Sequence, residues 1–289
     1  MDRLARMLVL GWLAMLVAGC GLTVQQKAAV QRFATATSSL ATVTSAELVS
    51  TRNDVIEMNT LRVELADGTM ASDRTASFFT VDRVKTRVDA VTALKDYAEL
   101  LQALATGSQA AQLQTAADEL VGSLRKLPGV GFSDEKAGAI SAAVQQVGGL
   151  VVEYMRAKAV RQVVETTHEP VLKVVDLVGG DFDPRADHWS LGYAVTISAL
   201  QGAAGLAQRS TAASMQGPLI GRSRVLADSN KERFNTIAKQ VGASVAALRE
   251  AQLALRSAVA TRGISVPQIQ SYAAQVEDFV KIYRILRAP

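Results

Sequence analysis

The chain has 289 residues, a formal net charge of +4 and a composition that is 49% hydrophobic but only 5% aromatic. The hydrophobic fraction is too high for intrinsic disorder, and the small positive charge gives no reason to expect nucleic-acid binding. One cysteine excludes an intramolecular disulfide and a multi-cysteine metal site, and two histidines disfavour a histidine-rich one. Alanine, the best helix former, accounts for 47 residues, so composition favours an all-α fold.

The first twenty residues have the organisation of a bacterial export signal. Arg3 and Arg6 make a short positive region, and an apolar run follows at Met7–Val17. This run is too short to cross a hydrocarbon core of about 30 Å as a helix. It ends in the sequence Val17-Ala18-Gly19-Cys20, where small residues precede the only cysteine of the chain.

This segment resembles the lipobox of bacterial lipoproteins. The resemblance covers residues 1–20 and implies that residues 1–19 are removed as a signal peptide and that Cys20 is acylated. An ordinary signal peptide or N-terminal anchor with a chance cysteine is the alternative. Two or three acyl chains on one residue would hold the protein stably on a membrane, because each buried CH₂ contributes about 0.8 kcal/mol. Gly21 follows the cysteine in place of Asp, which by analogy with Gram-negative sorting implies the outer membrane.

The mature chain, residues 20–289, is expected to form a single α-helical domain. Residues 21–66 are either a long first helix or partly a flexible tether, because the Thr/Ser-rich stretch 35–51 lowers helix propensity. Thr80 is the expected N-cap of the next helix, and Gly107 its end. A shorter helix is expected over 108–127. Ser133 is the expected cap of a helix that reaches about Thr167 and ends or kinks at Pro170.

The second half of the chain continues this pattern. Asp183-Pro184 predicts the start of a helix that reaches about Ala213 and precedes a Gly217-Pro218 turn. After Gly221 two sets of residues recur every seven positions, offset by three. They are Phe234, Val241, Leu248 and Leu255, with Ile237, Ser244, Ala251 and Ala258. This spacing indicates a coiled-coil-like seam. Ser265 and Gln268 then form a capping-box pattern that opens the last helix.

These elements predict an all-α fold, an elongated antiparallel helical bundle with coiled-coil-like long helices. The clearest ambiguity is Trp189–Gln208, about twenty residues without a charge. By length this segment could cross or insert into a membrane. Its polar residues and glycines favour the other interpretation, a central bundle helix that its neighbours cover on all sides.

Few residues suggest chemistry. Asp181, Asp183, Asp187 and His188 surround one turn, where a divalent ion is imaginable. Ser123 and Ser133 each precede a lysine by three residues, as in some acyl-transferring serine enzymes, but the companion motifs are absent and Ser133 is explained as a cap.

Two charged patterns are interpreted as solvated surface. Asp82, Asp89 and Asp96 repeat every seven residues. A basic patch is formed by Arg222, Arg224, Lys231 and Arg233.

The sequence therefore predicts a non-enzymatic helical scaffold or protein-partner adaptor, held by lipid on Cys20 and facing the periplasm. No catalytic, metal-binding or cofactor-binding residue is assigned, and a protein partner in the envelope is expected. One alternative is a lipoprotein that binds a small ligand or divalent ion at the Asp181–His188 turn or in an interhelical cleft. The other is a protein that inserts Trp189–Gln208 into a membrane.

Overall fold

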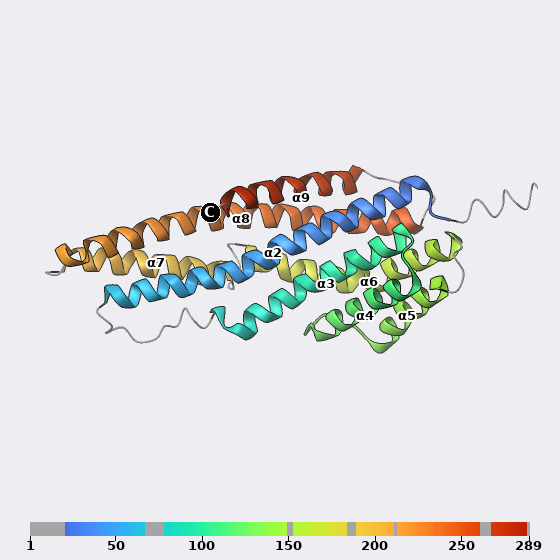
Figure 1. Cartoon of the computed structure of the whole chain (residues 1–289), viewed down its shortest axis with the longest axis horizontal. Coiled ribbons are helices and arrows are strands. Elements are labelled where there is room, and N and C mark those ends of the chain that lie inside the picture. The colour runs from blue at the N-terminus through green and yellow to red at the C-terminus, as the bar shows by residue number, and fades with distance from the viewer. Residues whose placement is uncertain are drawn as a thin grey trace, which may run out of the picture.

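The computed structural model of the chain is an elongated bundle of α-helices (Figure 1). It describes residues 21–66, 78–148, 153–183, 189–210, 213–260 and 267–287. These ranges contain eight helices and no strand: α2 (Val24–Leu65), α3 (Val81–Thr106), α4 (Ala110–Lys126), α5 (Asp134–Gly148), α6 (Glu153–Phe182), α7 (Trp189–Gln208), α8 (Ala213–Ala260) and α9 (Pro267–Leu286). The prediction of an all-α helical bundle is confirmed.

Helices α2 and α8 set the length of the molecule. They contain 42 and 48 residues, which at 1.5 Å per residue makes them about 63 and 72 Å long. The two helices are antiparallel. Gln26 Nε2 donates to the Ala258 carbonyl at 2.8 Å, and some thirty residues further along α2, Arg222 contacts Glu57 at 2.9 Å.

The order of the helices differs from a simple up-and-down bundle. Helix α7 continues in the same direction as α6, and α8 then returns along the whole molecule (Figure 1). As a result α2 is parallel to α9, with Thr37 beside Tyr272 and Glu47 beside Arg287. The antiparallel arrangement expected from the sequence therefore does not extend to α2 and α9. It does not extend to α2 and α7 either, because Asp54 contacts Tyr193 and, further along both helices, Leu65 and Ala207 line the same depression.

The heptad seam of α8 is confirmed. All eight predicted seam positions are buried. Six of them have no exposed surface, namely Ile237, Val241, Ser244, Leu248, Ala251 and Leu255, and the other two, Phe234 and Ala258, are less than 9% exposed. Small residues in the seam let neighbouring helices approach closely. A glycine has the same effect on α6, because a Cβ on Gly179 would lie 3.1 Å from Val245 Cγ1 of α8.

Two prolines lie inside helices where the sequence predicted breaks. Helix α6 passes through Pro170, and α8 includes Pro218 as its sixth residue. A proline removes one backbone hydrogen bond and strains the preceding turn. In α6, buried residues continue on each side of Pro170, from Val163 and Val164 to Val171 and Val174, whereas Pro218 lies among exposed residues in the first turns of α8. Tertiary packing therefore outweighs the local cost in α6, and the predicted Gly217-Pro218 turn is wrong, because α8 runs through both residues.

One predicted helix is divided in the structure. The single helix predicted from Ser133 to Thr167 is two helices, because α5 ends at Gly148 and α6 begins at Glu153. Residues 184–188 lie outside the described ranges and α7 is described from Trp189, so the predicted helix start at Asp183 stays a prediction. The Asp183 amide donates to the Gly180 carbonyl at 3.3 Å, in the turn that ends α6. The predicted caps at Thr80 and Ser133 are present, as is the left-handed Gly107 that ends α3.

The first described segment is a helix rather than a tether. Thr23 and Gln26 form a reciprocal capping box, with bonds of 2.9 and 3.1 Å. The threonines that lower helix propensity are used for packing, since Thr37, Thr44 and Thr51 are all buried. The helix runs without a break from Val24 to Leu65.

Removing the Leu248 side chain tests whether the α8 seam holds the bundle together. We expect Leu248→Ala to lower the free energy of unfolding by about 2–5 kcal/mol, because a fully buried leucine leaves a cavity. Leu253→Ala is the matched control on the same helix. Its side chain is 44% exposed, and we expect a loss below about 1 kcal/mol. Urea unfolding measures both, and equal losses would contradict the assignment of the seam.

Candidate functional site

Cys20 lies outside the described residues, so its acylation stays a prediction. Residues 1–19, the predicted signal peptide, also lie outside them. The described chain starts at Gly21, and α2 begins at Val24. Only residues 21–23 therefore separate the expected lipid attachment site, Cys20, from the start of α2.

The acidic turn that suggested an ion site is only partly described. Asp187 and His188 lie outside the described ranges. Asp181 is buried, and its carboxylate accepts a 2.8 Å ion pair from Arg87 of α3. The same guanidinium lies 4.9 Å from the Trp189 ring. Because a cation already neutralises Asp181, this residue joins α3 to α6 and is poorly placed to bind an ion. Among the described side chains, no group of three His, Cys, Asp or Glu residues is placed to hold a metal ion.

The two Ser-x-x-Lys patterns have structural roles. Ser123 Oγ donates to the Asp96 carboxylate. Ser133 Oγ accepts from the Lys136 backbone amide at 3.3 Å as the cap of α5. The first contact also corrects the expectation for Asp96, which is buried instead of lying on a solvated face. Asp89 does lie on that face and pairs with Lys85 at 2.5 Å.

Helix α7 is buried on one side only. Its inward side carries Trp189 and Tyr193, each less than 2% exposed. Its outward side has no charged residue and exposes Leu191, Val195 and Leu206 by 41, 42 and 58%. The segment is therefore a helix of the bundle that packs through its inward side. The expectation that neighbouring helices cover it on all sides is wrong, because the outward side is exposed. No helix in the described ranges is long and apolar enough to cross a membrane.

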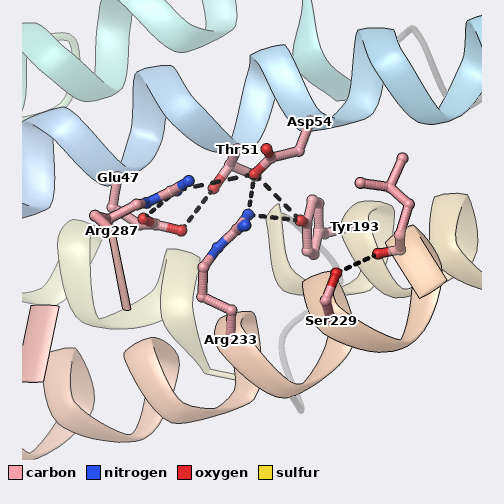
Figure 2. Close-up of polar contacts among 8 residues, drawn as sticks. Glu47, Thr51, Asp54, Tyr193, Ser229, Arg233 and Arg287 are labelled. Carbon is pink, nitrogen blue, oxygen red and sulfur yellow. Dashed lines mark hydrogen bonds and ion pairs between the residues drawn. The ribbon is translucent and has the colours of Figure 1, made fainter. Parts of the chain in front are cut away.

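A buried polar cluster joins four parts of the chain. Figure 2 shows two carboxylates and a threonine from α2 facing a tyrosine from α7, an arginine from α8 and an arginine that follows α9. We call this set the charge cluster. Its members are Glu47, Thr51, Asp54, Tyr193, Arg233 and Arg287.

Each carboxylate in the charge cluster has its own arginine. Arg287 donates to Glu47 at 2.6 Å and lies 3.8 Å from Asp54, while Arg233 donates to Asp54. Tyr193 donates its hydroxyl proton to Asp54 at 3.3 Å and accepts from Arg233 at the same distance. Two negative and two positive groups therefore balance within one set of contacts.

The electrostatics of the charge cluster are dominated by burial. Glu47 has no exposed surface. Burial raises the pKa of Glu47, and the positive charge of Arg287 opposes this rise. Burial likewise raises the pKa of Asp54 against the effect of Arg233, and it raises the pKa of Tyr193. A carboxylate and a tyrosine that are already paired offer no free acid or base, so the arrangement is suited to fixing the register of four segments.

Sequence reasoning missed the charge cluster. It placed Arg233 in an exposed basic patch with Arg222 and Arg224, yet Arg233 points inward and its side chain is only 16% exposed. The available signal was position. Arg233 directly precedes Phe234, the first residue of the buried heptad seam, so part of its side chain had to lie near the core.

A small cleft lies where α5, α6 and α8 meet. Its volume is 340 Å³, and its lining includes His168, Glu165 and Arg256. Arg256 pairs with Glu165 at 2.8 Å. Burial and the charge of Arg256 lower the pKa of His168, and its buried Nδ1 has no hydrogen-bond partner among the described residues. This cleft is the interhelical cleft that best fits the small-ligand alternative.

A larger groove of 740 Å³ lies between α2 and α9. It is lined by small and apolar residues together with basic ones, including Arg32 and Arg284. Neither the charge cluster nor any motif in the sequence marks this groove. It arises only because α2 and α9, far apart in sequence, lie side by side.

Comparisons with known proteins add no relative. No protein-family model matches the chain, and neither a curated protein nor a solved structure matches it.

Loss of the Glu47–Arg287 pair tests the charge cluster. We expect Arg287→Gln to lower the free energy of unfolding at pH 7 by about 3 kcal/mol, because Glu47 is then buried without its counter-ion. Arg284→Gln is the matched control. Its side chain is exposed three residues earlier, and we expect a change below about 0.5 kcal/mol.

The cost of Arg287→Gln should also depend on pH. A raised pKa means that folded Glu47 holds its proton more tightly than the unfolded residue, whose pKa is about 4.3. This group therefore makes the free energy of unfolding fall as pH rises above about 4.3, and loss of Arg287 steepens that fall. We expect a smaller cost at pH 4 than at pH 7 in urea unfolding. A cost that is equal at both pH values would show that the pair contributes no charge interaction.

Proposed function

We propose that this protein is a lipid-anchored adaptor of the bacterial cell envelope, a non-enzymatic helical scaffold that binds a protein partner. The observation that carries the proposal is the outward side of α7. That side exposes large apolar residues and no charge, although the opposite side of the same helix packs against α2 and α8. An exposed apolar surface with this continuity is typical of a protein contact.

The glycines of α7 support the same proposal. Gly202 and Gly205 lie in the helix, and a Cβ built on either would meet no atom within 4 Å. A glycine inside a helix costs about 1 kcal/mol relative to alanine. Since nothing within the described chain packs against these two positions, a surface of another molecule is the simplest use for them.

The anchor completes the proposal. The lipobox-like sequence ends at Cys20, and α2 begins four residues later. Acyl chains on Cys20 would therefore hold one end of the bundle close to the membrane, with Gly21 favouring the outer membrane and a periplasmic orientation. Within the described residues, the most buried charged side chains form ion pairs with one another. This pairing fits a scaffold.

The anchor is tested by Cys20→Ser in a Gram-negative host. We expect the variant to lose acylation and to move from the membrane fraction to the soluble periplasmic fraction, because one side chain carries the attachment. Mass spectrometry of the N-terminal peptide measures acylation, and Cys20→Ala is the second variant. A variant that is still acylated and membrane-bound would overturn the lipobox assignment.

The partner surface is tested by photo-crosslinking in cells. We expect a crosslinking residue at Val195 to give a discrete product with another protein. Leu253 is the matched control, since its side chain is 44% exposed against 42% for Val195 but lies on α8. Products of equal yield at both positions, or a chain recovered only as an isolated monomer, would contradict the adaptor function.

A further inference from the structure

The groove between α2 and α9 is built from two matching stripes. From α2 it is lined by Ala28, Gln31, Arg32, Thr35, Ala36 and Ser39. From α9 it is lined by Ala273, Val276, Glu277, Val280, Lys281 and Arg284. In both helices the lining positions follow the spacing i, i+3, i+4, i+7, i+8, i+11. This is the spacing of one helix face that packs against another helix.

The two stripes run in the same direction and cover about three turns each. Eleven residue steps along a helix correspond to about 17 Å, so the groove is long enough for a helical segment of three turns. The groove has a volume of 740 Å³ and is partly open to solvent. A small compact molecule would fill only part of such a groove.

Helix α3 provides the far wall. Both α3 and α9 pack along α2, and in the described part of the chain they do not pack along each other. A second depression extends from the groove onto α3 and shares Thr35, Ser39 and Gln102 with it. Gln102 Oε1 is buried there and has no hydrogen-bond donor among the described residues. An incoming donor would satisfy this oxygen.

The floor of the groove allows close approach. Ala28, Ala36 and Ala273 carry a single methyl group, and Val276 and Val280 add apolar surface. Small side chains between two helices let the backbone of a third helix come near, as they do in the α8 seam. The floor therefore favours a helix with its own small or apolar face over an extended peptide.

The rim of the groove is positively charged. Arg32 and Arg284 are exposed on opposite sides, and neither has an ion pair or a hydrogen bond in the described chain. Lys281 differs, since it lies 3.1 Å from Glu277 and 3.4 Å from Asp278. The two arginines are thus the charged side chains left to contact an occupant, and they complement carboxylates.

From this geometry we propose that the α2–α9 groove binds an amphipathic helix of another protein, with small apolar residues along one face and acidic residues at its borders. The mode is that of a helix in a groove between two helices. This inference rests on the proposed adaptor function, which it extends by naming the chemistry of the partner. The groove is separate from the outward side of α7.

The experiment places a photo-crosslinking residue at Thr35, which is exposed in the middle of the α2 stripe, in the full-length chain in cells. The crosslinked peptide is then identified by mass spectrometry. We expect a protein segment with an excess of Asp and Glu and a helical spacing of apolar residues. A lipid, a basic segment or a second copy of this chain at Thr35 would overturn the proposal.

Charge reversal tests the rim. We expect Arg32→Glu with Arg284→Glu to lower the Thr35 crosslinking yield about tenfold, because two attractive contacts become repulsive. Lys158→Glu with Arg209→Glu is the matched control. It reverses two exposed charges outside the groove, and we expect an unchanged yield. Circular dichroism establishes that both variants fold. An equal yield from the two double variants would overturn the acidic character of the partner.

The groove and the adaptor function can fail separately. A product at Val195 without one at Thr35 would leave the adaptor function standing and refute the groove. The absence of products at both positions would refute both. A product at Thr35 that charge reversal weakens supports the groove whatever the outcome at Cys20, because binding to the groove does not require acylation.

Discussion

The packing of α8 is the constraint on which the rest of the bundle depends. This helix contacts α2, α6, α7 and α9 along its 48 residues. Its seam of fully buried residues packs against helices along the whole molecule, α6 toward one end and α7 toward the other. Because α6 and α7 follow one another along the same side of α8 (Figure 1), the break between them does not divide the molecule into separate bundles. The small residues of the seam bring the backbones close, which in turn leaves little room for large cavities inside.

The charge cluster makes that packing specific. Apolar seams with a seven-residue period can slide by one heptad with little change in buried area, because similar residues come into the same positions. Such a slide would separate Glu47 from Arg287 and Asp54 from Arg233. Two carboxylates would then be buried without counter-ions, which is far more costly than a changed apolar contact. The ion pairs thus select one alignment of α2 with α8 and with the residue that follows α9.

The sequence predicted what depends on local or periodic patterns. The seam from Phe234 to Ala258 and the caps at Thr80 and Ser133 follow from spacing and side-chain type alone. Pro170 was misjudged because tertiary burial on both sides of this proline outweighs one lost hydrogen bond. Neither the charge cluster nor the groove could be derived, since each depends on which distant helices become neighbours. Arg32 and Arg284 are separated by about 250 residues in the sequence.

The uninterrupted course of α2 has a mechanical consequence. Helix α2 runs from Val24 to Leu65 without a proline or an internal glycine, so it is a rigid rod rather than a flexible linker. With lipid on Cys20, the end of the bundle where α7 ends and α8 begins would lie at a fixed distance from the acylated end. This distance, about 60 Å, is set by the number of residues in α2. Insertion or deletion of whole turns in α2 and α8 together would then change that distance in steps of one helical turn. The α2–α9 groove, which is near the anchored end, would keep its distance from the lipid.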